Sequence, residues 1–289
     1  MQMLPMTPKS ARVLMLAIGL GAGWQASADT FTFTVEPSYP PEQAQEVYKP
    51  LVDYLERTTG HKFTLNTPRN YHLHWRDIRR GMPFDFVYEE AHFVDYRAQR
   101  YDFEPLVKKA NQTVYTLIAD EQFADKGLAG LVGRRIVSMP APSLGFSLLA
   151  EMYSNPISQP DFRSEATSWR DGVEMVFAGD AEAAMVPSFI AAEYPNLIPI
   201  KESRALAGAA ISAAPTVSAE VKQAVREALL KLHEDKDAYN TLVELGATQF
   251  EVTSAKEYFG AEKALSSFFG YVPPSTPAPA AEPAVKAVE

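Results

Sequence analysis

Short strand-like runs are followed again and again by segments of helical period. Phe31, Phe33 and Val35 alternate with threonines, as in a strand with one buried face. The stretch 42–59 then repeats apolar residues at helical spacing and stops at Gly60. This order returns several times, so the pattern predicts an α/β fold with mostly parallel sheets flanked by helices.

The later elements are predicted from the same two patterns, the alternation of a strand and the spacing of a helix. We expect a helix from the N-cap Ser218 onward, because its apolar positions form a single stripe. Further extended runs are expected at 62–66, 84–88, 104–109, 113–119, 135–139, 183–186 and 197–200. Further helices are expected at 75–80, 92–100, from 143, 173–178, 237–245 and 255–268.

The first 28 residues have the pattern of an export signal. A basic start precedes an apolar run at 13–24, and ASA at 26–28 is the small-residue pattern that signal peptidases cleave. The apolar run is shorter than the roughly 20 residues that cross a bilayer. We therefore expect a cleavable signal peptide over 1–28, a mature periplasmic chain from Asp29, and no direct membrane insertion after cleavage.

Charge and cysteine content narrow the function classes. The chain holds 27 Lys and Arg against 36 Asp and Glu, and a chain from Asp29 carries −11 because the first 28 residues contain two basic and no acidic side chains. A negative chain without a basic stripe is unsuited to nucleic acid, so no such partner is expected. With no cysteine, disulfides, thiolate metal sites and a lipoprotein anchor are excluded.

The composition changes after Tyr271. The stretch PPSTPAPAAEPAVKAVE is rich in Pro and Ala and has little to bury, so we expect a disordered tail over 272–289. The folded part is expected to span 29–271.

Five weak motifs occur in one order with compatible spacing. They are VYKPLVDYLERTTG, RRGMPFDFVYEEAHF, LVGRRIVSMPAPSLG, FAGDAEAAMV and GAAISAAPTVSAEVKQAVREALLKL. Together they resemble the periplasmic binding proteins of phosphonate, phosphite and phosphate importers, a branch of the type II solute-binding fold, over nearly all of 31–269.

The resemblance implies two lobes, each a mostly parallel sheet flanked by helices, with two crossing strands as a hinge. The first lobe would combine 29–115 with 208–271, and the second would span 116–207. The ligand would lie between the lobes, where the ends of strands face a cleft.

One candidate ligand contact is a strand-to-helix junction. Ser143, Gly145 and Ser147 open the helix expected from 143, so free backbone N–H groups and two hydroxyls could converge on an anionic oxygen. The alternative is that Ser143 only caps the helix and Gly145 only permits close packing.

Glu89 and Glu90 follow the strand at 84–88 and are expected to face the cleft. The relatives tend to have small or Gly-Pro residues there, and they bind the amine of aminoalkyl phosphonates through acidic side chains. One carboxylate, with Glu89 as our candidate, could pair with an amine on the ligand. Alternatively, both acids only favour the N-terminus of the next helix.

Three aromatic residues complete the candidate set. Tyr39 and Tyr71 are expected in the loops after the first and second strands, which reach into the cleft in this fold. Trp169 stands about where the relatives have a Ser-His pair, and its indole N–H can donate only once. That departure weakens the case for a phosphonate ligand, and Trp169 could equally be a core residue.

Two rival classes of function fit the sequence less well. His72, His74 and His92 with Glu89 and Glu90 could form a metal site, but their spacing is not diagnostic, so no metal and no cofactor are expected. The chain contains no nucleophile elbow, metalloprotease motif, phosphate-binding loop or dinucleotide turn, so no enzyme is expected.

The sequence thus predicts a periplasmic binding protein that captures a small oxyanion, phosphonate-like or phosphate-like and possibly amine-bearing, for an ABC importer. Its expected partners are the ligand and an ABC permease. The alternatives are a sensory or accessory subunit for a membrane sensor, and another small organic or cationic solute.

Overall fold

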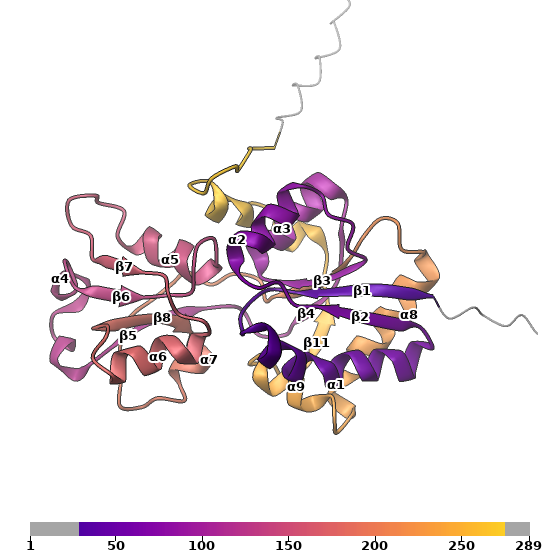
Figure 1. Ribbon diagram of the computed structural model, residues 1–289, viewed down its shortest axis with the longest axis horizontal. Coiled ribbons are helices and arrows are strands. Elements are labelled where there is room, and N and C mark those ends of the chain that lie inside the picture. Colours follow the sequence, from indigo (N-terminus) through magenta and orange to yellow (C-terminus); the bar gives the residue numbers. More distant parts are fainter. Residues whose placement is uncertain (1–28, 275–289) are drawn as a thin grey trace, which may run out of the picture.

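Two α/β lobes lie side by side in the computed structural model, which describes residues 29–274 (Figure 1). The predicted signal peptide and most of the predicted tail lie outside the described residues. One lobe is built on a six-stranded sheet of order β11-β4-β10-β3-β1-β2, and the other on a five-stranded sheet of order β7-β6-β8-β5-β9. The two-lobed α/β class expected from the sequence is confirmed.

The first lobe combines both ends of the described chain. Strands β1 to β4 run in one direction, and β10 and β11 run in the other. Its strands are β1 (Thr30–Val35), β2 (Lys62–Asn66), β3 (Phe86–Glu89), β4 (Glu104–Lys109), β10 (Ala210–Ala213) and β11 (Phe250–Val252). Its α-helices are α1 (Pro41–Thr59), α2 (Tyr71–Arg79), α3 (Ala91–Tyr101), α8 (Ala219–Leu230) and α9 (Tyr239–Glu244).

The second lobe comes from the middle of the chain. Strands β6 to β9 run in one direction and β5 runs against them. Its strands are β5 (Tyr115–Ala119), β6 (Arg135–Val137), β7 (Asp161–Arg163), β8 (Ala183–Pro187) and β9 (Ile198–Glu202). Its α-helices are α4 (Gly127–Gly130), α5 (Leu144–Met152), α6 (Trp169–Phe177) and α7 (Ser188–Ala191).

Two segments, 110–114 and 203–209, connect the lobes. Thr113 and Leu206 pair across them as an antiparallel bridge, with N–H to carbonyl distances of 3.0 and 2.9 Å. A narrow two-stranded link of this kind is where rotation of one lobe against the other is concentrated.

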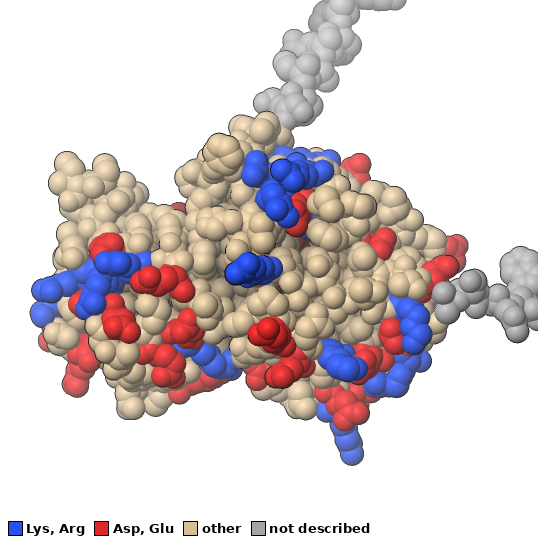
Figure 2. All heavy atoms as spheres, viewed as in Figure 1, with Lys and Arg blue, Asp and Glu red and all other residues tan. Residues whose placement is uncertain are grey.

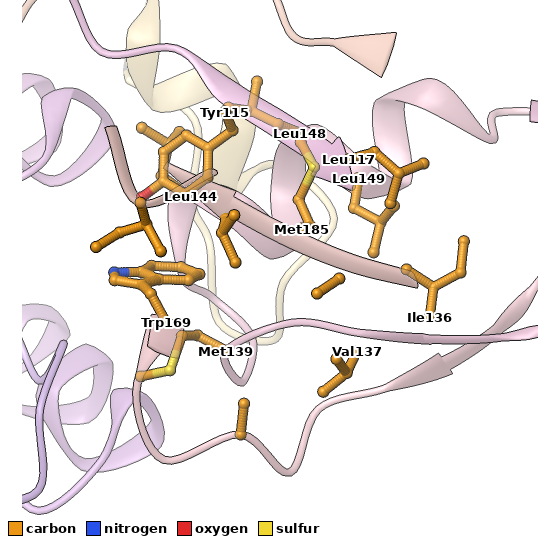
Figure 3. Close-up of a cluster of buried hydrophobic side chains, with 14 of the residues drawn as sticks. Tyr115, Leu117, Ile136, Val137, Met139, Leu144, Leu148, Leu149, Trp169 and Met185 are labelled. Carbon is orange, nitrogen blue, oxygen red and sulfur yellow. The ribbon is translucent and has the colours of Figure 1, made fainter. Parts of the chain in front are cut away.

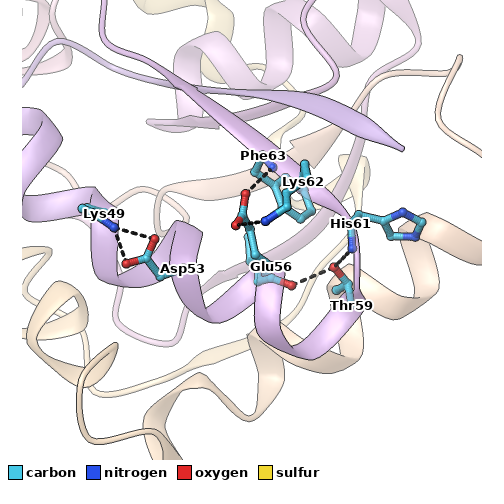
Figure 4. A network of polar contacts seen from close by, with 8 residues as sticks. Lys49, Asp53, Glu56, Thr59, His61, Lys62 and Phe63 are labelled. Atoms are coloured by element: carbon cyan, nitrogen blue, oxygen red, sulfur yellow. Dashed lines mark hydrogen bonds and ion pairs between the residues drawn. The ribbon is translucent and has the colours of Figure 1, made fainter. Parts of the chain in front are cut away.

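Helix α1 shows how closely local sequence sets an element. The helix ends at Gly60, which has a φ of 75°, the left-handed region that glycine enters without strain. The Glu56 carboxylate then accepts the N–H of Phe63 at 3.0 Å and pairs with Lys62 at 3.0 Å, which ties the end of α1 to β2 (Figure 4). Lys49 and Asp53 form a further pair one turn apart on the exposed side of α1.

Two helix predictions need correction. Helix α2 begins four residues before the predicted start at 75, because the Asn70 side chain caps it by accepting the N–H of Leu73 at 2.9 Å. Instead of one helix over 255–268 there are two short 3-10 helices, η3 (Ala255–Tyr258) and η4 (Ala261–Leu265). Gly260 separates them with a φ of 89°, which no continuous helix permits.

The core of the second lobe lies between its sheet and α5. Leu117, Ile136, Leu148, Leu149 and Met185 are fully or almost fully buried there (Figure 3). Burying each such side chain contributes about 1.5–3 kcal/mol. The same apolar cluster continues through the boundary between the lobes to α2, α3 and η4, so the lobes share packed side chains along one edge.

Within residues 29–274, no helix has the length and apolar character that a membrane span needs. The same residues hold no group of three or more His, Asp or Glu side chains arranged to bind a metal ion. On the face in Figure 2, acidic and basic side chains are interspersed over both lobes.

Candidate functional site

A pocket lies between the two lobes, beside the crossing segments. The first lobe supplies the loop after β1, the ends of β3 and β4, and part of α9, and the second lobe supplies Trp169, Pro187 and Phe189. The remaining lining residues are Glu36, Ser38, Tyr39, Tyr48, Tyr88, Glu90, Lys109, Ala209, Glu244 and Leu245. Because both lobes line it, a ligand held here would bridge them.

Acidic and aromatic side chains dominate this interlobe pocket. Glu36, Glu90 and Glu244 face a single lining cation, Lys109. Aromatic rings make up much of the remaining wall, from Tyr39, Tyr48, Tyr88, Trp169 and Phe189. Carboxylates among aromatic faces form surroundings that favour a positive charge over a negative one.

Glu36 is the most deeply buried acid of the pocket, with 3% of its surface exposed. It follows β1 directly, and its Oε2 accepts the backbone N–H of Glu90 at 2.7 Å. Burial, followed by the charge of Glu90, raises the pKa of Glu36 well above its ordinary value.

Glu90 lies beside Glu36, at the start of α3. Its Oε2 accepts the Thr113 hydroxyl at 3.1 Å, which links it to a crossing segment. Burial raises the pKa of Glu90, and the nearby Lys109 opposes that rise. The Lys109 ammonium itself donates to the Leu245 carbonyl at 3.1 Å and lies 5.7 Å from the centre of the Phe189 ring.

Tyr39 lies in the loop after β1, as predicted, at the side of the pocket where the lobes touch. Its hydroxyl donates to the Glu244 carbonyl at 3.0 Å, and burial, followed by the Glu244 charge, raises its pKa to about 12. Arg170 of the second lobe pairs with Glu244 at 3.1 Å and with Glu193 at 3.0 Å. Glu244 therefore joins the two lobes.

Glu89, our candidate for the cleft, points away from it. Successive residues of a strand face opposite sides, so Glu90 reaches the interlobe pocket while Glu89 is buried between β3, α2 and α3. Arg97 contacts its carboxylate at 2.7 and 3.0 Å, and His74 Nε2 lies 2.8 Å from it. Burial would raise the pKa of Glu89, but Arg97 and His74 outweigh it and lower that pKa to about 2.

At the start of α5, where an anion site was predicted, both serine hydroxyls bond to helix backbone. The Ser143 hydroxyl accepts the N–H of Phe146 at 3.2 Å, and the Ser147 hydroxyl donates to the Ser143 carbonyl at 3.1 Å. Both side chains are buried. Ser143 caps the helix, as the alternative interpretation proposed.

Gly145 and Trp169 meet at the same place (Figure 3). A Cβ on Gly145 would lie 2.9 Å from the rings of both Trp169 and Tyr115, so those rings cover the first turn of α5. Trp169, the first residue of α6, thus packs in the core and also lines the interlobe pocket.

Tyr71 is the first residue of α2, not a loop residue as predicted. It lines a second hollow between the lobes, together with the loop after β1 and residues of the second lobe. Its buried hydroxyl lies beside Glu36, and a hydrogen bond from it lowers the pKa of that carboxyl.

The three histidines considered for a metal belong to no metal-binding group within residues 29–274. The HLH sequence forms part of α2, which exposes His72 and buries His74 against Glu89. His92 Nε2 lies 2.9 Å from the Pro142 carbonyl and donates to it, since a carbonyl only accepts. Burial lowers the pKa of His92 to about 4, so the ring is neutral and forms a second contact between the lobes.

Sequence reasoning missed Glu36, Lys109 and Glu244. Glu36 and Lys109 do carry a signal, because each lies at the carboxyl end of a strand, where clefts form in α/β folds. Glu244 lies near the end of a short helix, and nothing local marks it as a cleft residue.

Two lobes joined by two crossing segments, with a pocket between them, define a type II solute-binding protein. The family model described as ABC transporter, phosphonate, periplasmic substrate-binding protein matches residues 33–258. The chain belongs to this family. The resemblance drawn from the five motifs is confirmed.

Solved structures share the fold at low identity. PhnD1 from Prochlorococcus marinus in complex with methylphosphonate has a TM-score of 0.70 and 14% identity, covering 82% of this chain and 97% of that chain. A binding-protein component of an ABC phosphonate transporter from Pseudomonas aeruginosa has a TM-score of 0.66 and 13% identity, covering 82% and 85%. A Xanthomonas citri protein bound to ATP has a TM-score of 0.62 and 14% identity, covering 82% and 97%. No curated protein sequence matches the chain.

Proposed function

We propose that this chain captures a small phosphonate-type solute between its lobes and delivers it to the membrane subunits of an ABC importer. The observation that carries this proposal is the interlobe pocket, whose lining comes from both lobes. The first lobe's contribution includes the end of β4. Family membership supports the transport role. The chain acts as a binding protein without catalysis, in the periplasm after loss of residues 1–28.

Closure follows from the position of the pocket. A ligand that touches both lobes binds the closed form better than the open form, and this difference drives closure. The hinge lies at the crossing segments, between a lobe of 29–115 with 208–271 and a lobe of 116–207. Residues proposed to touch the ligand are Tyr39, Glu36, Glu90, Lys109 and Trp169, while Glu89, Ser143, Gly145 and Ser147 support the walls.

A thermal-shift screen of the mature chain tests this proposal. The panel contains phosphonates, phosphate, amines, amino acids and divalent metals. A ligand at 100 times its Kd adds about 2.7 kcal/mol to the free energy of unfolding, and we expect this from a phosphonate-type compound. Trp169→Ala should weaken the shift. A transition that responds only to metals would contradict the proposal.

A further inference from the structure

The segment 255–272 follows β11 and touches the first lobe, a crossing segment and the second lobe. It contains η3 and η4, and its end is drawn in yellow beside α2, at the boundary between the lobes (Figure 1). We propose that this segment is a brace that holds the two lobes together before any ligand binds. The brace acts on the ligand-free protein, and only its effect on binding rests on the proposed function.

The brace is fixed to the first lobe at two places. The buried Glu262 carboxylate pairs with Arg100, which also donates to the Val272 carbonyl at 2.6 Å. Between these points, the indole N–H of Trp75 donates to the Phe269 carbonyl at 2.9 Å. Trp75 belongs to α2 and Arg100 to α3, so both helices hold the brace against the first lobe.

The same segment reaches the hinge and the second lobe. The Tyr258 hydroxyl donates to the Gly208 carbonyl of a crossing segment at 2.9 Å. The Phe268 ring packs against Phe146 of α5, with the ring centres 6.0 Å apart. Leu265 is fully buried in the apolar cluster that spans both lobes. The brace thus connects helices of the first lobe to α5 of the second.

These contacts favour the arrangement in which the lobes lie together. Rotation of the second lobe about the crossing segments carries α5 with it, so Phe146 would separate from Phe268. An aromatic pair with its apolar surroundings is strong enough to change the ratio of closed to open forms about tenfold. The brace therefore sets how much of the ligand-free protein is closed.

Distances between labels on the two lobes test the brace on the mature chain. The chain has no cysteine, so Gln43→Cys in α1 and Ile157→Cys in the second lobe, both at exposed positions, carry the only spin labels. Without ligand, we expect Phe268→Ala to raise the ratio of open to closed forms about tenfold, measured by double electron–electron resonance. Phe269→Ala is the matched control and should leave the distances unchanged, because its ring is 89% exposed and lies over Arg79 of the first lobe.

Binding rates give a second measurement. Methylphosphonate would enter through the open form and be held by the closed form. Phe268→Ala should therefore raise its association rate constant a few-fold and its dissociation rate constant about tenfold. A variant that only destabilised the fold would leave both rate constants of the folded fraction unchanged.

A variant on the other side of the contact separates the outcomes. Phe146→Ala removes the partner ring from the second lobe and should shift the distances as far as Phe268→Ala, with little further shift in the double variant. Unchanged distances in both single variants, or an equal shift from Phe269→Ala, would overturn the inference. Should Phe268→Ala fail to fold, Phe146→Ala decides alone. If the distances shift but methylphosphonate does not bind, the brace stands and the proposed function loses its support.

Discussion

At the residue scale, the two neighbouring acids Glu89 and Glu90 have opposite roles. Glu89 is fully buried and bonded to Arg97 and His74, which makes it a structural charge. Glu90 reaches the pocket next to Glu36. The sequence marked both acids, but only the pleat of β3 decides which one lines the pocket, because one residue along a strand reverses the side chain.

Glu89→Gln should destabilise the protein by about 3–5 kcal/mol at neutral pH, since it leaves Arg97 buried without its counter-charge. The lowered pKa of Glu89, about 2, means that its stabilisation is present above the unfolded-state pKa and is lost as the pH falls toward 2. Urea unfolding should therefore show the gap between variant and parent closing in acid. Asp53→Asn, which removes only the exposed pair with Lys49, should change stability by less than about 1 kcal/mol. An equal loss from both variants would contradict the assignment.

At the element scale, the start of α5 shows why a sequence motif can mislead. Ser143 to Ser147 has the residues of an anion-binding turn, and the structure uses them as a cap and a packing site. The cap was predictable because serine is a common N-cap. The rings of Tyr115 and Trp169 over Gly145 were not, because they come from β5 and α6, far along the chain.

Two glycine variants test this packing. Gly145→Ala should destabilise by about 1–3 kcal/mol, because its Cβ would press on two rings at 2.9 Å. Gly172→Ala in α6 meets only ordinary contacts at 3.7 Å, so it should be neutral or stabilise by up to about 1 kcal/mol. Thermal denaturation of both variants gives the comparison. A stabilised Gly145→Ala would show that the rings do not cover this turn.

At the scale of the whole molecule, contacts at separate points join the lobes beside the crossing segments. Arg170 of α6 pairs with Glu244 of α9, and His92 of α3 donates to the Pro142 carbonyl. The pairing of Arg170 with Glu244 is partly exposed, so this ion pair adds little to the stability of the closed form.

Arg170→Ala should raise the ratio of open to closed forms a few-fold in the absence of ligand and weaken ligand binding a few-fold. An exposed ion pair contributes about 0.2–1 kcal/mol, which corresponds to a change of a few-fold in an equilibrium constant. Small-angle scattering should show a larger radius of gyration, which added ligand should reduce. Arg163→Ala removes a pair with Asp161 inside the second lobe and should leave the radius unchanged. Identical radii for Arg170→Ala and the parent would contradict this role.

The sequence by itself determined the α/β class, most helices and strands, and the family, because these depend on local periodicity, caps such as Ser218, and motif order. It also placed Tyr39 in the loop after β1 and near the pocket. Only the tertiary structure decided that Glu36, Glu90 and Lys109 line one pocket and that Trp169 covers α5. These residues lie far apart in the chain, and it is the order of the strands and the contact between the lobes that bring them together.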